Sequence, residues 1–156
     1  MLKQLTQLTV AADGRYATAD ELQFISDYLA TAEQRISAYV KVRNAASDII
    51  DTFAAERRSQ YPNAFQIGGK DVSGFALRDM TNVLRCCSAA ALINDLDRLQ
   101  EAVLLWLQSI AKSFGWRQHA EIDYGMLQEI IKTYLTDEEA QMILPAIKLA
   151  QTTLSL

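Results

Sequence analysis

Helical spacing of apolar residues, with few chain breakers, is the feature that most constrains the fold of this 156-residue chain. Between Asp71 and Asn94, apolar residues stand at positions 76, 77, 80, 83, 84, 87, 90 and 91, the spacing of one face of an α-helix. The whole chain contains only two prolines and six glycines, which is too few for a turn-rich β fold. The sequence therefore predicts an all-α protein.

Capping signals divide the rest of the chain into further predicted helices. Thr18 with Glu21, and Thr136 with Glu139, form capping boxes, and Gly115 is a typical C-terminal stop. We expect helices over 2–12, 18–43, 45–59, 71–93, 95–114, 124–135 and from 136 onward, with a break at Asn44 and no confident strand. Trp106 is predicted to lie in the core. The length fits one domain spanning residues 1–156.

The composition of the chain argues against several classes of function. A net charge of −4 argues against nucleic acid as a partner, and no apolar run is long enough for membrane insertion. The adjacent Cys86 and Cys87 are interpreted as reduced thiols of a cytoplasmic protein. The single His119 lacks companions at metal-ligand spacing, and no nucleophile is paired with a base, so we expect neither a metal site nor an enzyme.

Charged residues interrupt the apolar run at Arg78, Asp79 and Arg85. An unpaired charge in a buried helix is costly, so these residues are expected to serve a ligand or a partner. Arg57 and Arg58, by contrast, are interpreted as part of a solvated face.

Several short motifs follow one another in an order and spacing that resemble the phycobilisome phycobiliproteins, such as allophycocyanin and phycocyanin subunits. They cover nearly the whole chain and are Asp13-Gly14-Arg15-Tyr16 running into Glu21-Leu22, Tyr28 to Arg35, Gly68-Gly69, Leu77-Arg78-Asp79, Leu84-Arg85 and Ser113-Phe114-Gly115. The resemblance implies a globin-like phycobiliprotein fold with an N-terminal helical pair as an extension.

The resemblance also implies a cofactor. In that family, a cysteine two residues before the Arg-Asp step carries a linear tetrapyrrole (bilin) through a thioether. The arginine holds a propionate of the pigment, and the aspartate accepts hydrogen bonds from the inner pyrrole nitrogens. Arg78 and Asp79 match those two residues, but Ala76 stands at the attachment position. The implied cofactor is a noncovalently bound bilin such as phycocyanobilin, and the absence of any pigment stays an equal alternative.

Two further residues are candidates for contacting a pigment. Asn82 replaces an aromatic residue that usually follows the Arg-Asp step. Cys86 lies seven residues beyond Asp79 on nearly the same helix face, roughly 10 Å along the axis, which is within reach of a bilin. For both Cys86 and Cys87 the other interpretation is that of a small buried hydrophobic residue.

Asp13 and Arg85 match an aspartate and an arginine that join two subunits reciprocally in the family. Leu5 and Leu8, together with Leu2, form the apolar face of the N-terminal segment, which a partner chain is expected to cover. The implied partner is a homologous subunit, in a homodimer or heterodimer or a higher ring. The other interpretation of Asp13 and Arg85 is an ordinary exposed charge pair within one chain.

The expected function is that of a phycobiliprotein-like subunit in light harvesting and energy transfer, with a noncovalent bilin or in a pigment-free structural role in a phycobilisome-type assembly. Its expected place is the cytoplasm, including the cytoplasmic face of the thylakoid membrane. The alternative is a globin-like sensor or interaction module without chromophore, in which Arg78 and Asp79 form an internal salt bridge. Three questions stay open: which bilin would be bound, whether the chain is α-like or β-like, and whether its partner is a second copy or a paralogue.

Overall fold

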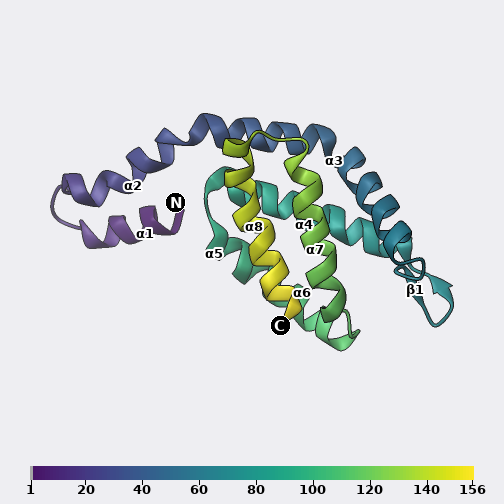
Figure 1. The fold of residues 1–156 in the computed structure, drawn as a ribbon. Helices are drawn as coiled ribbons and strands as arrows, with labels where there is room; N and C mark the ends of the chain where they lie inside the picture. The colour runs from purple at the N-terminus through teal and green to yellow at the C-terminus, as the bar shows by residue number, and fades with distance from the viewer. Residues whose placement is uncertain (1) are drawn as a thin grey trace.

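The computed structural model describes residues 2–156, and the side chain of Leu2 lies outside the described part. The chain is almost entirely helical, which confirms the all-α prediction (Figure 1). Its elements are α1 (Leu2–Ala11), α2 (Ala19–Ala30), α3 (Ala32–Gln60), β1 (Gln66–Ile67), β2 (Lys70–Asp71), α4 (Ser73–Ile93), α5 (Leu96–Leu99), the π-helical turn η1 (Gln100–Leu104), α6 (Leu105–Ser113), α7 (Arg117–Lys132) and α8 (Asp137–Ser155).

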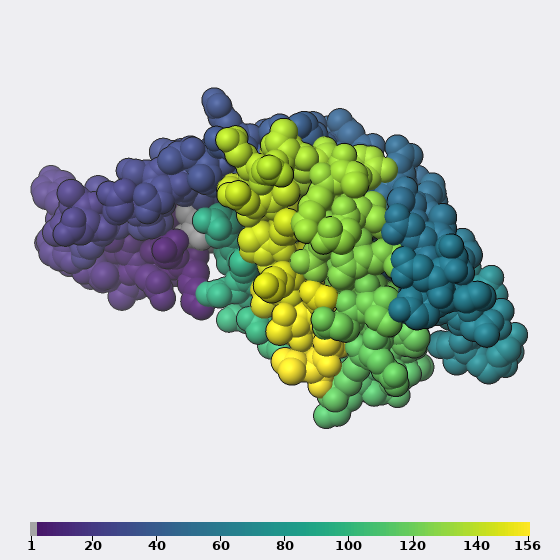
Figure 2. Space-filling view, in the orientation of Figure 1, coloured from purple at the N-terminus to yellow at the C-terminus, as the bar shows by residue number. Residues whose placement is uncertain are grey.

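The helices form a body and an arm (Figures 1 and 2). In the body, α7 and α8 run side by side, α3 passes across both of them, and α4 packs against α3 and α8. Helices α1 and α2 form a helical hairpin, the arm, that projects from the body. The core fills the body alone, and its largest fully buried side chains include Phe53, Ile49, Leu84, Leu104, Leu127, Ile131, Ile143 and Ile147.

The arm and the body are separated by a helix break at Thr31, not at Asn44, so the predicted break was misplaced. Helix α2 ends at Ala30, and α3 runs without interruption through Asn44 to Gln60. The side chain of Asn44 accepts hydrogen bonds from Arg43 and so does not compete for the helix backbone. Thr31 instead ends α2 and starts α3 at a change of direction.

The predicted cap signals at three helix ends are confirmed. Thr18 and Thr136 each form the full capping box. Gly115 has a φ of 69°, a left-handed conformation that suits glycine. These local signals were sufficient to place the corresponding helix boundaries.

Helix α7 begins seven residues earlier than the prediction of Tyr124, at Arg117. The carbonyl of Trp116 accepts hydrogen bonds from the backbone of His119 and Ala120, which starts the helix directly after Gly115. His119 therefore lies in the first turns of α7 instead of in a loop.

The glycine pair lies in a short antiparallel hairpin formed by β1 and β2, where no strand was predicted. Gly68 and Gly69 have φ values of 57° and 78°, as a tight two-residue hairpin turn requires. The pairing involves two residues on each side and extends no further.

Trp106 is exposed, with 65% of its surface accessible, so the prediction that it lies in the core was wrong. The turn before it, Gln100–Leu104, is π-helical. A π-turn fits an extra residue into one turn, which rotates every later side chain relative to the regular α-helical pattern. Leu104 is fully buried, and the rotation leaves Trp106 on the outside.

Glu139, in the capping box at the start of α8, is expected to make the stability of the fold depend on pH in the acid range. Hydrogen bonds from Lys41, Ser37 and the backbone of Thr136 lower the pKa of Glu139 from 4.5 to about 2. A carboxylate with a depressed folded-state pKa stabilises the fold above its unfolded pKa, and this contribution is lost as the pH falls through the folded value. We expect stability to fall between pH 4.5 and about 2, and Glu139→Gln to flatten that decline.

Chemical denaturation at a series of pH values measures this effect. Glu138→Gln is the matched control, because Glu138 is the exposed neighbour on the same turn. An unchanged acid decline in Glu139→Gln would contradict the assignment.

Candidate functional site

One stripe of α4 presents the predicted cofactor-binding residues on the surface. Phe75, Arg78, Asp79, Asn82 and Cys86 stand at the spacing of a single helix face. Phe75 and Asn82 are exposed, and the side chains of Arg78 and Asp79 are 65% and 45% accessible. The structure thus places the four predicted pigment contacts along one side of one helix.

The opposite face of α4 is buried, which fixes the direction of this stripe. It carries Met80, Val83, Leu84, Cys87, Ala90 and Ala91 in the core. The expectation that Arg78 and Asp79 lie within a buried run was therefore wrong. They follow the helical period onto the solvent side, where charge carries little desolvation cost.

Arg78 and Asp79 interact only weakly with each other. Their closest atoms, Nη2 and Oδ1, are 3.5 Å apart, and the guanidinium carbon of Arg78 lies 5.4 Å from the centroid of the Phe75 ring. An exposed pair of neighbours contributes little to stability. Most of the hydrogen-bonding capacity of both groups is therefore open to a ligand.

The two cysteines differ in their surroundings. Cys87 is fully buried and lies 3.6 Å from the carbonyl oxygen of Ala146, and burial raises its pKa to about 12. Such a thiol is unreactive, because the thiolate is the nucleophile. Cys86 is half-buried at the edge of the stripe, so it is the one of the two that a ligand could reach.

Ala76 is half-buried and packs against the core at the start of α4. Its methyl group provides no sulfur for a thioether.

In the part of the chain that the structure describes, no three His, Cys, Asp or Glu side chains come together to hold a metal ion.

The predicted interface residues Asp13 and Arg85 both face solvent. Asp13 lies in the turn between α1 and α2 at the tip of the arm, and Arg85 lies on α4 in the body (Figure 1). Neither side chain takes part in an ion pair among residues 2–156. The interpretation of a charge pair within one chain has no support in this arrangement.

The arm leaves much apolar surface uncovered. Leu5 and Leu8 are half-buried, and α2 has no buried residue. Val10 is 76% exposed and Leu29 is 64% exposed. An ion pair of 3.0 Å between Lys3 and Asp97 joins α1 to α5.

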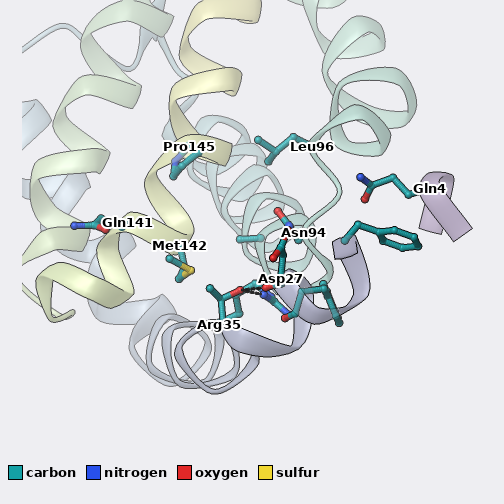
Figure 3. A pocket seen from close by; sticks show the side chains of 12 residues that line it. Gln4, Asp27, Arg35, Asn94, Leu96, Gln141, Met142 and Pro145 are labelled. Atoms are coloured by element: carbon teal, nitrogen blue, oxygen red, sulfur yellow. Dashed lines mark hydrogen bonds between the residues drawn. The ribbon is translucent and has the colours of Figure 1, made fainter. Parts of the chain in front are cut away.

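A cavity of about 400 Å³ lies where the arm meets the body (Figure 3). Gln4 reaches it from α1, Asp27 from α2, and Met142 and Pro145 from α8. Arg35, at the base of the arm, lines the cavity and is itself only 3% exposed.

Arg35 connects three helix ends, a role that the sequence analysis missed. Its guanidinium donates hydrogen bonds to the carbonyl of Leu92 at 3.0 Å, to the carbonyl of Tyr28 at 2.7 Å and to the hydroxyl of Thr31. It also lies 3.9 Å from the centroid of the Tyr28 ring. Its one sequence signal is the spacing of Tyr28, Thr31 and Arg35, which places all three near one another at a helix junction.

Arg57 corrects a second expectation. It is 2% exposed, so it does not belong to a solvated face, and its Nε lies 2.6 Å from a carboxylate oxygen of Asp123. Arg58, the next residue, is exposed as expected.

None of the helices formed by residues 2–156 has the length and apolar character needed to cross a membrane.

Comparisons with known proteins identify the family of this chain. A family model described as "Phycobilisome protein" matches residues 8–154. Allophycocyanin subunit beta-18 of Picosynechococcus sp. is 28% identical over 65% of this chain and 63% of its own length. Allophycocyanin alpha-B chains of Pyropia yezoensis and Porphyra purpurea are 29% and 26% identical, over 71% and 90% of this chain and 73% and 92% of their own lengths.

The match to the family model runs from α1 to α8, through both the arm and the body. The all-α body with its N-terminal helical pair is the globin-like phycobiliprotein fold that the resemblance implied. The chain therefore belongs to the phycobilisome protein family.

Proposed function

We propose that the chain is a light-harvesting subunit of a phycobilisome-type assembly that binds a bilin noncovalently along α4 and pairs with a homologous subunit through its arm. It is not an enzyme in this proposal, and it works in the cytoplasm at the surface of the thylakoid membrane. The observation that carries the proposal is the exposed stripe of α4, which retains the Arg78-Asp79 step beside Ala76.

The stripe supports bilin binding through three kinds of group. Arg78 offers a guanidinium for a propionate, and the Asp79 carboxylate can accept hydrogen bonds from pyrrole N–H groups. Phe75 adds an exposed ring at the start of the stripe. Asn82 and Cys86 continue the stripe, so that a pigment lying along α4 would meet them next.

The arm supports the pairing. Its exposed apolar side chains and the unpaired Asp13 at its tip suit a second subunit whose own Arg85 faces outward in the same way. Such an exchange uses the same two groups on each chain, as a symmetric interface requires.

Replacing Asp79 by asparagine is expected to weaken bilin binding at least about tenfold, because a hydrogen bond to a charged acceptor is replaced by one to a neutral amide. The protein is co-expressed with a bilin-producing pathway, and its visible absorbance is recorded before and after denaturation in acid. We expect colour in the native protein that separates from the chain under denaturing electrophoresis. Asp48→Asn, at an exposed position on α3, is the control and should leave the colour unchanged.

Other outcomes point elsewhere. Colour that stays on the denatured chain contradicts noncovalent binding and indicates a bond to Cys86, which Cys86→Ala would remove. A colourless native protein favours the pigment-free structural role, for which Ala76 is the supporting observation. Unchanged pigment uptake in Asp79→Asn with a loss of thermal stability supports a chromophore-free sensor or interaction module.

A further inference from the structure

A second cavity, of about 450 Å³, lies at the other end of α3, away from the arm. The last turns of α3, the loop of residues 61–64 and the first turns of α7 surround it. Its lining combines the apolar side chains of Tyr61, Pro62 and Ile122 with the polar groups of Arg57 and His119. None of these residues belongs to the stripe on α4.

Arg57 is the one Arg, Lys, Asp or Glu side chain in this lining, and it is almost completely buried. Its Nε forms the ion pair with Asp123 at 2.6 Å, and its Nη2 lies 3.0 Å from Nδ1 of His119. The Tyr61 ring covers the guanidinium, with 4.3 Å between the ring centroid and the guanidinium carbon. Tyr61 itself is 43% exposed, so its ring can turn outward.

The buried guanidinium of Arg57 has an N–H group that is not satisfied. Nη1 of Arg57 has no hydrogen-bond partner among the described residues. Oδ1 of Asp123 is also buried, and the ion pair holds it 2.6 Å from Nε of Arg57. A buried donor on a charged group that is left without an acceptor is costly, and a ligand oxygen would remove this cost.

We propose that this cavity binds a small aromatic carboxylate. One carboxylate oxygen accepts a hydrogen bond from Nη1 of Arg57 once the Tyr61 ring turns outward. The apolar body of the ligand lies against Tyr61, Pro62 and Ile122. A guanidinium is well matched to a carboxylate, and the cavity has room for one aromatic ring.

The charge of Asp123 sets how strongly such a ligand binds. Arg57 from α3 and His119 from α7 face this carboxylate, and the buried Tyr124, the next residue on α7, also interacts with it. Burial raises the pKa of Asp123, and the nearby charges of Arg57 and His119 only partly oppose that rise. A proton taken up by Asp123 would free the guanidinium charge for the ligand, so binding should tighten as the pH falls.

The test uses benzoate as the probe and the ring signals of His119 as the reporter. His119 is the only histidine, so its NMR resonances belong to this cavity without further assignment. Benzoate is expected to shift these signals in a saturable way. Benzamide, which has the same shape without the charge, is expected to bind at least about tenfold more weakly.

Two arginine variants make a matched pair. Arg57→Gln is expected to weaken benzoate binding at least about tenfold, and Arg58→Gln, which changes the exposed neighbour, should bind like the unmodified protein. Circular dichroism checks that each variant is folded. If Arg57→Gln unfolds, the comparison of benzoate with benzamide on the unmodified protein decides alone.

Asp123→Asn imitates the protonated carboxyl and is expected to bind benzoate several-fold more tightly with a weaker pH dependence. Equal binding of benzoate and benzamide would overturn the proposal, as would an absence of any benzoate-dependent shift of His119. A loss of binding in Arg58→Gln with binding retained in Arg57→Gln would also overturn it. Since no residue of the α4 stripe takes part, these results are independent of bilin binding.

Discussion

Replacing Arg35 by leucine is expected to lower the free energy of unfolding by about 3 kcal/mol. The guanidinium is buried, and it satisfies the carbonyl of Tyr28 at the end of α2 and the carbonyl of Leu92 at the end of α4. Leucine leaves both carbonyls without this donor. It also removes the contact with the Tyr28 ring.

Urea denaturation of the monomer measures this loss. Arg43→Leu is the matched control on the same helix, because Arg43 is exposed and donates only to its neighbour Asn44. We expect the control to change stability by less than about 0.5 kcal/mol. Equal stabilities of the two variants would show that Arg35 does not hold the base of the arm.

The helix starts marked by capping boxes were predicted correctly, because the groups that form a capping box are close in sequence. Thr18 and Glu21 satisfy each other's backbone across three residues, as do Thr136 and Glu139. The periodicity of α4 likewise named its buried face, including Met80 and Leu84. Such features depend on the helix itself and need no knowledge of the remaining fold.

Features that depend on distant contacts were not predictable in this way. The sequence predicts a solvated Arg57 because its partner Asp123 is far along the chain and meets it only after α3 has crossed α7. Arg35, four residues after the helix break at Thr31, donates a hydrogen bond to Leu92, again a contact between distant segments. Trp106 was misplaced because nothing in its local sequence indicated the π-turn that precedes it.

For the candidate site on α4, the residues that share one helix face were predicted, but their exposure was not. Resemblance to the phycobiliproteins selected Arg78, Asp79, Asn82 and Cys86, and the structure brings all four onto one stripe of α4. The charges were expected within a buried run, although the periodicity that identifies the buried face of α4 already places them off that face. Because the side chains of Arg78 and Asp79 are exposed in the folded molecule, their charges carry little desolvation cost and are accessible to a ligand.

Reversing the charge at the tip of the arm is expected to weaken pairing of the subunit about 100-fold. Asp13→Arg would place an arginine against Arg85 of the partner, and a symmetric dimer contains this contact twice. The combined variant Asp13→Arg with Arg85→Asp restores opposite charges at both contacts, so we expect it to recover most of the affinity in a dimer of identical chains. Asp20→Arg, at another exposed position of the arm, is the control for net charge.

Sedimentation velocity over a range of concentrations measures the pairing, with the chain alone and mixed with a homologous subunit. Leu8→Glu provides an independent perturbation, because it places a charge on the apolar face of α1 that the partner would cover. Recovery in the double charge reversal would identify the partner as a second copy of the chain. If Asp13→Arg and Leu8→Glu both pair as the unmodified chain does, the arm is not the interface and its apolar surface must have another purpose.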